Sequence, residues 1–264
     1  MDILVCVKRV PMVGGRVVVT ADGQDVDTRM SGFTVSPHEE CAVEEAVRIT
    51  ERLGGTVTAL TLGPAAAADQ LRDMLALGAG HGVLLETDGR EWGPIATAAA
   101  IAAAVRRRAA GPAGGYDLLL FGNEAADTGD YQVPVRVAHA LGLPCVTGIK
   151  NLEITGPGDG AGAASRARAS REYLGGEEVF ELTLPAVISV REGINLPRYP
   201  SLPGRLRAKR AVIERFEPEY HAEGLRKELL RVPAGQTKRA EILGTGADAV
   251  PALVRLLEEL GVLS

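Results

Sequence analysis

Along the first 150 residues, short runs of aliphatic and β-branched residues alternate with longer segments in which apolar residues recur at helical spacing. The runs predict strands at residues 3–7, 57–62, 83–85 and 118–121, and the segments predict helices at residues 39–53, 66–77, 95–109 and 133–141. Such alternation is typical of right-handed βαβ units. We therefore expect an α/β fold, a Rossmann-like mostly parallel sheet with helices on both faces.

The expected element boundaries carry their own signals. Ser36, Pro37 and Glu39 form a capping-box pattern with proline at the first helical position. Glycines stand where three of the helices should end, at Gly54, Gly78 and Gly142. Asp22-Gly23 between valine-containing runs predicts a β-hairpin, which would lengthen one edge of the sheet.

The pattern changes after residue 150. Residues 152–154, 167–173 and 179–182 are expected to form an antiparallel extension, residues 156–162 a glycine-rich surface insertion, and residues 184–190 a buried strand. Core periodicity fades over residues 200–246, and helical spacing resumes at residues 249–260. We expect an α/β core at residues 1–190, a loop and basic segment at residues 191–210, and a C-terminal arm at residues 211–264 that orders against the core or a partner.

Composition narrows the functional classes. A net charge of −5 argues against nucleic acid as the default ligand. Three cysteines without a C-x-x-C spacing and four scattered histidines predict neither a disulfide framework nor a metal site. The longest apolar stretch, residues 95–105, is too short to span a bilayer, so we expect a packed helix and no membrane insertion. The N-terminal residues enter a strand without a secretory signal, which favours a cytoplasmic protein.

A ligand is expected beyond the carboxyl ends of the parallel strands, where backbone amides and helix N-termini converge. Four segments reach this edge: the ends of the first two strands, the start of the first helix, and the small-residue loop after the fourth strand. Their candidate cofactor-binding residues are Cys6, Ser36, Pro37, His38, Glu39, Leu62, Gly122, Asn123, Glu124, Ala125, Ala126, Asp127, Thr128, Gly129, Asp130, Tyr131, Gln132 and Val133. Because the chain has neither G-x-G-x-x-G nor a Walker A motif, spacing alone leaves a structural turn and a nucleotide site open.

Several of these side chains also have plain structural interpretations. Cys6 lies on a buried strand and is expected to fill space rather than act as a redox thiol. His38 is expected to face solvent. Asp127 and Asp130 have no evident nucleophile, base and orienting group to join, so no catalytic residue is assigned.

The strand at residues 184–190 leads into a proline-stiffened loop and then a basic run, a composition suited to docking another protein. The sequence Leu-Pro-Ala-Val at residues 184–187, followed by Ile194, Asn195, Pro197, Arg198 and Tyr199, resembles the recognition loop of the electron transfer flavoprotein β-subunit family. Residues 3–11, 42–48 and 75–79 also match, so the resemblance covers nearly the whole chain.

The resemblance implies an electron carrier subunit without catalytic residues of its own. Members of this family pair with an α-subunit that holds FAD, accept electrons from flavin dehydrogenases such as acyl-CoA dehydrogenases, and pass them to a quinone oxidoreductase. The resemblance also implies that Ile194 inserts into a pocket on the dehydrogenase, although a loop aliphatic can instead pack on its own core. The C-terminal arm would pack on the α-subunit.

The four edge segments match the positions at which family members hold AMP. Gln132 is kept, but Asp130 and Tyr131 stand where the family has a threonine and a small residue or asparagine. Bifurcating members of the family place a second FAD at this site. AMP is therefore the first expectation and a second FAD the alternative.

Two alternatives come from other functional classes. One is an ATP-using enzyme of the adenine nucleotide hydrolase-like group, which shares this kind of sheet but carries an S-G-G-x-D-S-type loop where this chain has residues 8–12. The other is a stand-alone adenine-nucleotide sensor, which would fold without a partner. The basic residues Arg205, Arg207, Lys209 and Arg210 could meet FAD phosphates, an acidic α-subunit surface or only water.

Overall fold

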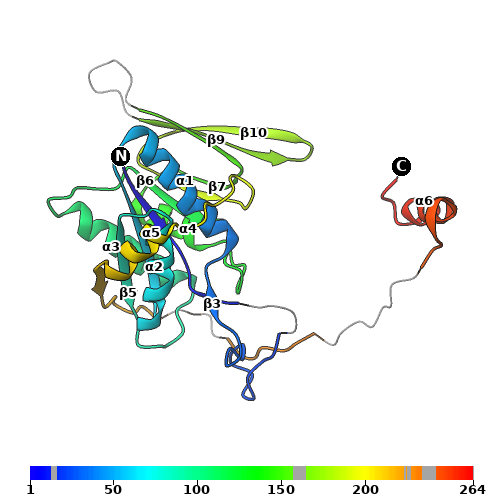
Figure 1. The fold of residues 1–264 in the computed structure, drawn as a ribbon, viewed down its shortest axis with the longest axis horizontal. Helices are drawn as coiled ribbons and strands as arrows, with labels where there is room; N and C mark the ends of the chain where they lie inside the picture. The colour runs from blue at the N-terminus through cyan, green and yellow to red at the C-terminus, as the bar shows by residue number, and fades with distance from the viewer. Residues whose placement is uncertain (13–16, 157–164, 223, 225–226, 234–241, 264) are drawn as a thin grey trace. The chain divides into compact units, whose positions relative to one another are not determined.

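A computed structural model describes residues 1–12, 17–156, 165–222, 224, 227–233 and 242–263 (Figure 1). Its central sheet has the strand order β12-β5-β4-β1-β6-β11-β7, and every neighbouring pair is parallel. The strands are β1 (Asp2–Cys6), β4 (Thr56–Gly63), β5 (His81–Glu86), β6 (Leu118–Gly122), β7 (Cys145–Ile149), β11 (Ala186–Val190) and β12 (Ile213–Phe216). This sheet confirms the predicted Rossmann-like α/β fold.

Helices cover both faces because alternate residues of each strand point to opposite sides of the sheet. Ile3 and Val5 of β1 belong to the core cluster that contains residues of α1 (Pro37–Leu53), α2 (Ala68–Leu77) and α5 (Leu202–Arg210). Leu4 and Cys6 belong to the cluster with α3 (Pro94–Ala109) and α4 (Val133–Leu141). A short 3₁₀ turn, η1 (Ala65–Ala67), precedes α2. The helix ends follow the sequence signals, with Ser36 as the N-cap of α1 and Gly54, Gly78 and Gly142 as C-caps.

A separate antiparallel sheet contains β8 (Asn151–Thr155), β9 (Arg166–Tyr173) and β10 (Gly176–Thr183). It confirms the predicted antiparallel extension, and one of its faces is buried in the cluster that includes α1, through residues such as Leu152 and Ala169. The predicted glycine-rich insertion lies outside the described residues, apart from Gly156.

Two valines confirm the predicted hairpin, since Val19 and Val26 form an antiparallel bridge around Asp22-Gly23. A second two-stranded ribbon pairs β2 (Val10–Pro11) with β3 (Phe33–Thr34). Among the described residues neither ribbon joins the central sheet, so the prediction that the hairpin lengthens a sheet edge is wrong.

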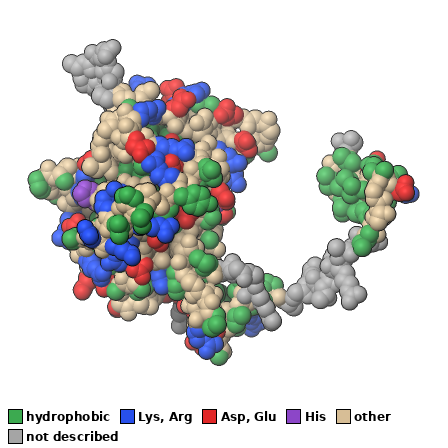
Figure 2. Space-filling view, viewed as in Figure 1, with side chains coloured by type: hydrophobic (Ala, Val, Ile, Leu, Met, Phe, Trp, Pro, Cys, Tyr) green, Lys and Arg blue, Asp and Glu red, His purple; other side chains and the backbone are tan. Residues whose placement is uncertain are grey.

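Residues 200–246 contain two core elements that the fading periodicity did not predict, because α5 packs against α2 and β12 pairs with β5. Only Gly204 and Ala208 of α5 are buried. A Cβ at Gly204 would lie 2.7 Å from the carbonyl oxygen of Ala76 in α2, so the two helices meet through small residues and backbone. A contact of this kind leaves no periodic pattern of large apolar residues in the sequence. Figure 2 shows basic side chains over the face that carries α5.

Sequence analysis also missed β7. This edge strand pairs with β11 with a break in register, and Gly148 within it has φ 71°. Because β7 is irregular, its sequence shows only a weak alternation of apolar and polar residues, and the strand was not predicted.

The chain divides into two compact units, residues 1–230 and residues 231–264. The second contains η2 (Gly246–Ala249) and α6 (Val250–Glu259), which confirms the predicted C-terminal helix. No residue of α6 is buried, although the helix carries an apolar face. Among the described residues, no helix has the length and hydrophobicity that crossing a bilayer requires.

Candidate functional site

The carboxyl ends of β1 and β6 mark a topological switch point. The two strands are neighbours, but the strands that follow them lie in opposite directions along the sheet. After β1 the chain continues to β4, toward one edge, and after β6 it continues to β7, at the other edge. Open α/β sheets bind ligands at such a point. A cleft of about 810 Å³, its open mouth included, lies there, and small-molecule sites typically occupy about 300–1,000 Å³.

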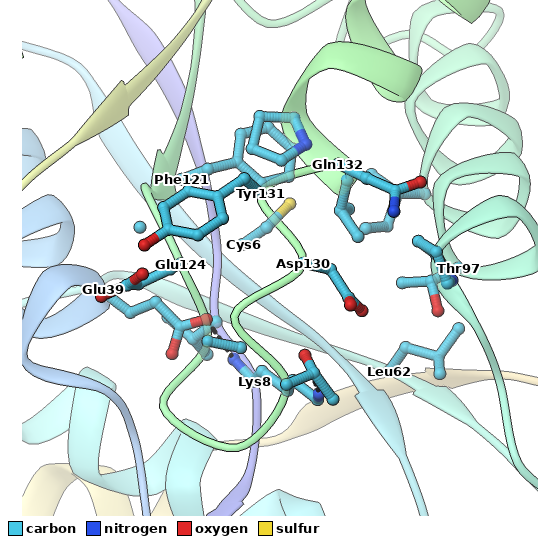
Figure 3. A pocket seen from close by; sticks show the side chains of 18 of the residues that line it. Cys6, Lys8, Glu39, Leu62, Thr97, Phe121, Glu124, Asp130, Tyr131 and Gln132 are labelled. Atoms are coloured by element: carbon cyan, nitrogen blue, oxygen red, sulfur yellow. Dashed lines mark hydrogen bonds between the residues drawn. The ribbon is translucent and has the colours of Figure 1, made fainter. Parts of the chain in front are cut away.

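Figure 3 shows side chains that line the cleft. Of the predicted cofactor-binding residues, the lining contains Cys6, Glu39, Leu62, Gly122, Asn123, Glu124, Ala125, Thr128, Asp130, Tyr131, Gln132 and Val133. The predicted residues outside the lining are Ser36, Pro37, His38, Ala126, Asp127 and Gly129. The remaining lining residues fall into two groups. Val7 and Lys8 follow Cys6 in the predicted edge segment at the end of the first strand, and the sequence did not single out Leu60, Trp92, Gly93, Pro94, Thr97, Ile101, Phe121 and Pro134. A signal for the α3 residues existed, because Gly93-Pro94 starts a helix after the parallel strand β5.

The N-terminus of α1 forms one wall through Glu39. Its Oε2 accepts the N–H of Ser36 at 3.1 Å, which closes the reciprocal half of the capping box, and its Oε1 accepts the N–H of Lys8 at 3.0 Å. The Glu39 side chain is buried, and burial raises its pKa to about 8 against the lowering effect of these two N–H donors. A carboxyl with this pKa is largely protonated at neutral pH.

The loop at residues 122–132 is joined to the neighbouring elements at several points. The Lys8 ammonium lies 2.8 Å from Asp127 Oδ1, and Ser36 Oγ accepts the N–H of Ala126 at 3.0 Å. Gly122 is required at the start of the loop, because a Cβ there would lie 2.6 Å from Cγ of Glu39. These contacts bring the first strand, the first helix and the loop together, as the sequence predicts.

The same loop is tied to the buried strand β11. The Asn123 N–H donates to the Val190 carbonyl at 2.9 Å, and Asn123 Oδ1 accepts the Ser189 hydroxyl at 3.1 Å. At the other end, Tyr131 has φ 57°, an unfavourable backbone region for a non-glycine residue. Tyr131 and Gln132 thus turn the loop sharply into α4.

His38 does not face solvent as expected. Its imidazole is mostly buried, its Nδ1 accepts the N–H of Glu192 at 3.2 Å, and its Nε2 lies 3.5 Å from Glu124 Oε1. The prediction was wrong because residues 191–200 fold back over the start of α1. His38 therefore contacts both the cleft loop and the segment after β11.

Cys6 is buried beneath the cleft, in agreement with its predicted role in packing. Burial, with a smaller contribution from the nearby Glu39, raises the pKa of its thiol. A thiol held in this protonated form is a poor nucleophile. Among the described residues, no cluster of His, Cys, Asp or Glu side chains has an arrangement that would hold a metal ion.

The predicted recognition residues 194–199 divide into inward and outward groups. Arg198 points inward: its Nε donates to Glu44 Oε2 at 2.9 Å and its Nη1 to Glu51 Oε1 at 2.6 Å. Hydrogen bonds to Glu51 and Glu44 raise the pKa of the Arg198 guanidinium. Asn195 also points inward, and its Nδ2 donates to the Cys41 carbonyl at 3.0 Å.

The side chains that point outward are not the ones that the resemblance predicts. The resemblance predicts that Ile194 contacts the partner. Ile194 is half-buried and packs against the main core cluster, and Pro197 is also half-buried. Leu196 is 83% exposed and Tyr199 is 95% exposed. An alternation of apolar and polar residues in a loop does not reveal which side chains face solvent, so sequence reasoning did not single out Leu196.

Comparison with known proteins agrees with the resemblance. A family model described as electron transfer flavoprotein domain matches residues 26–220. The chain is 34% identical over 234 residues to "Electron transfer flavoprotein subunit beta" of Bacillus subtilis, which covers 85% of this chain and 86% of that protein. Identity is 36% over 211 residues to the protein of the same name from Syntrophomonas wolfei, covering 80% and 77%, and 31% over the full length of both chains for that of Bradyrhizobium diazoefficiens.

The matched range, which holds the cleft loop and residues 191–200, defines an electron transfer flavoprotein domain. Given the names and coverage of its relatives, the chain belongs to the electron transfer flavoprotein β-subunit family.

Proposed function

We propose that this chain is one half of a heterodimeric electron carrier. Its partner, an α-subunit, holds FAD, receives electrons from flavin dehydrogenases such as acyl-CoA dehydrogenases, and passes them to a quinone oxidoreductase. The observation that carries the proposal is that a single fold presents a ligand cleft at its sheet edge and a firmly held loop with exposed apolar side chains. The chain contributes scaffold, nucleotide site and docking surface, and no catalytic residue of its own.

The cleft is proposed to hold AMP. Lys8 supplies a cation at the end of β1, and the loop at residues 122–132 supplies backbone amides near a phosphate. Glu124 and Asp130 also line the cleft, and such carboxylates suit ribose hydroxyl groups rather than a phosphate. Glu39, with its pKa of about 8, adds little negative charge at neutral pH.

The identity of the bound nucleotide can be tested directly. Acid extraction of the purified heterodimer followed by chromatography should release AMP in a ratio close to one per heterodimer, together with one FAD. Two flavins and no AMP per heterodimer would instead establish the bifurcating type with a second FAD. The extension of the cleft to Trp92 and Thr97 favours that second candidate, since it offers room beyond the four segments.

The arm is proposed to pack on the α-subunit. Because β12 belongs to the sheet, the proposed bounds of the arm change from residues 211–264 to residues 231–264, which form the second unit. A helix such as α6, with an apolar face and no buried residue, gains stability by covering that face. A chain truncated after Leu230 should keep its fold by circular dichroism but lose co-elution with the α-subunit. Undiminished co-elution would remove this role.

Docking of the dehydrogenase is proposed for residues 191–200. The inward hydrogen bonds of Asn195 and Arg198 fix the backbone before a partner arrives, which lowers the entropy that docking loses. Ile194, Leu196 and Tyr199 are the side chains that would contact the partner. Leu196 and Tyr199 are exposed without any rearrangement, whereas Ile194 would have to leave its own core.

A further inference from the structure

The carboxyl end of β11 joins the cleft to the recognition loop, defined as residues 191–200. This loop starts beside the cleft loop, residues 122–132, because β11 and β6 are parallel neighbours and each loop follows its strand. The N–H of Asn123 donates to the Val190 carbonyl at 2.9 Å, and the Ser189 hydroxyl donates to Asn123 Oδ1 at 3.1 Å. The two loops are therefore hydrogen-bonded to each other's surroundings at the point where both begin.

This junction is fixed from inside the sheet. Ser189 is fully buried, and its Oγ also accepts the N–H of Gly148 on β7 at 3.1 Å. The Ile149 carbonyl, next along β7, accepts the N–H of Arg191 at 2.9 Å. Buried polar groups that are all paired have few alternative arrangements, because each broken hydrogen bond would leave an unpaired group. The recognition loop thus starts from a rigid position, and Glu192 is the next residue to be held.

His38 holds Glu192 and forms a second connection between the loops. Its Nδ1 accepts the N–H of Glu192 at 3.2 Å, so the proton of the neutral imidazole lies on Nε2. Nε2 lies 3.5 Å from Oε1 of Glu124, a residue that lines the cleft. Figure 3 shows Glu124 on the side of the cleft where Glu39 lies. The imidazole therefore stands between a carboxylate that faces the ligand space and the backbone of the recognition loop.

Glu192 belongs to the turn that places the proposed docking side chains. The N–H of Ile194 donates to the Arg191 carbonyl at 3.3 Å, and Gly193 between them has φ 91°. Glycine is favoured in this backbone region because it has no Cβ. Ile194 and Leu196 follow Glu192 by two and four positions. A change in the position of Glu192 would therefore move both of them.

We propose that His38 is a positioning residue through which a ligand in the cleft sets the shape of the recognition loop. This inference rests on the proposed functions of the cleft and of residues 191–200. A ligand hydroxyl group bound to Glu124 fixes the orientation of that carboxylate. The carboxylate then holds the Nε2–H of His38 and, through the imidazole, the N–H of Glu192. When the cleft is empty, the Glu124 carboxylate can turn toward water, and the turn at residues 191–194 loses this support.

The connection must act in both directions. If a filled cleft favours the docking shape of the loop, docking of a partner must strengthen ligand binding by the same factor, because one coupling free energy links the two events. Coupling between sites typically changes affinity by about five- to 150-fold. We expect about fivefold, the low end of this range, because a single imidazole carries the second connection.

Two substitutions separate coupling from simple support of the loop. His38→Asn places an amide oxygen where Nδ1 accepts the N–H of Glu192, but it removes the Nε2–H that faces Glu124. His38→Ala removes both contacts. The side chain of His38 is not part of the cleft lining, so neither variant removes a direct ligand contact. His139→Ala, which replaces a histidine on α4, is the matched control.

The heterodimer freed of bound nucleotide would be measured by hydrogen exchange with mass spectrometry, with and without AMP. In the wild type we expect AMP to slow amide exchange about fivefold in both loops. In His38→Asn, AMP should slow exchange in the cleft loop but not in the recognition loop. His38→Ala should respond in the same way, and its recognition loop should also exchange faster without AMP. The control should match the wild type.

The remaining outcomes overturn one level of the proposal or the other. AMP protection of the cleft loop alone in the wild type overturns the coupling, as does equal protection of both loops in the wild type and both His38 variants. Loss of AMP binding in His38→Asn would place His38 in ligand binding and overturn its positioning role. If calorimetry shows no AMP binding to the wild-type complex, the proposed AMP site fails, and the coupling fails with it.

Discussion

The cleft loop at residues 122–132 and the recognition loop at residues 191–200 both lie against α1, but they use their polar side chains in opposite ways. In the cleft loop, Glu124, Thr128 and Asp130 line a shared space in which a ligand can bind. In the recognition loop, the side chains of Asn195 and Arg198 donate hydrogen bonds to α1. Glu124, Thr128 and Asp130 of the first loop are thus placed for recognition, whereas Asn195 and Arg198 of the second hold its shape.

This difference changes how the recognition motif is interpreted. An Asn-x-Pro-Arg-Tyr segment suggests polar contacts with a partner, yet the guanidinium of Arg198 bonds to Glu44 and Glu51 of its own chain. The residues left for the partner are apolar and aromatic. His38 contacts both loops, through Glu124 and the backbone of Glu192.

The largest expected effect concerns Glu39 and pH. Its pKa in the fold is about 8, above the value of 4.5 for a free glutamate, so the folded chain holds a proton that the unfolded chain releases. Raising the pH from about 4.5 to about 8 should therefore destabilise the wild type relative to Glu39→Gln, by roughly 1.4 kcal/mol per unit of pKa shift. Above this window the difference should level off.

Urea unfolding at a series of pH values measures this effect. Glu153→Gln, at an exposed position on β8, is the control and should follow the wild type. Unfolding free energies of wild type and Glu39→Gln that change in parallel with pH would contradict the buried, protonated carboxyl.

A smaller loss of stability is expected for Arg198→Ala. The Glu44 side chain is only 3% exposed, and among the described residues Arg48, at 2.6 Å, would be its one remaining cationic partner. We expect the free energy of unfolding to fall by about 2 kcal/mol, the usual cost of losing hydrogen bonds to a charged group. Arg191→Ala, at an exposed position of the same loop, should change it by less than about 0.5 kcal/mol. Equal effects of the two substitutions would show that Arg198 does not hold the loop.

Substitutions at the loop tip should affect electron transfer more than stability. We expect Leu196→Ala to slow reduction of the heterodimer flavin by a cognate dehydrogenase about tenfold, with unchanged flavin content and unfolding. Ile194→Ala should lower the free energy of unfolding by about 1 kcal/mol because Ile194 packs on the core. Stopped-flow kinetics of both variants test this order, and a stronger kinetic effect of Ile194→Ala would make Ile194 the anchor.

The smallest effect on stability is expected for substitution of His38, which contacts both the cleft loop and the recognition loop. His38→Ala removes the acceptor for the Glu192 N–H, worth about 1 kcal/mol, so amides near Glu192 should exchange with solvent several-fold faster. Hydrogen exchange measured by mass spectrometry detects this change. His139→Ala on α4 is the control, and identical exchange in both variants would remove His38 as a link.

Local signals account for what the sequence predicted well. The alternation of strands and helices predicted the parallel sheet, the Ser36–Glu39 pattern predicted the start of α1, and the small-residue loop after the fourth strand predicted one side of the cleft. Each of these depends on neighbouring residues or on the general rule that ligands bind at a switch point.

The misses depend on contacts between distant segments. Gly204 packs against backbone in α2, so α5 has no amphipathic pattern to detect. Trp92 and Thr97 enter the cleft only because α3 begins at the same sheet edge. The inward direction of Arg198 depends on two glutamates about 150 positions away in the chain, a pairing that one sequence does not reveal.

The central claim is that this chain works only as part of a two-chain carrier whose flavin is held by the companion. The most direct measurement is the flavin content and reducibility of the full chain purified alone and purified with the α-subunit. We predict no bound flavin and no electron transfer for the chain alone, and one FAD, reducible by a dehydrogenase, for each heterodimer. A chain that by itself binds flavin and turns over substrate would contradict the account.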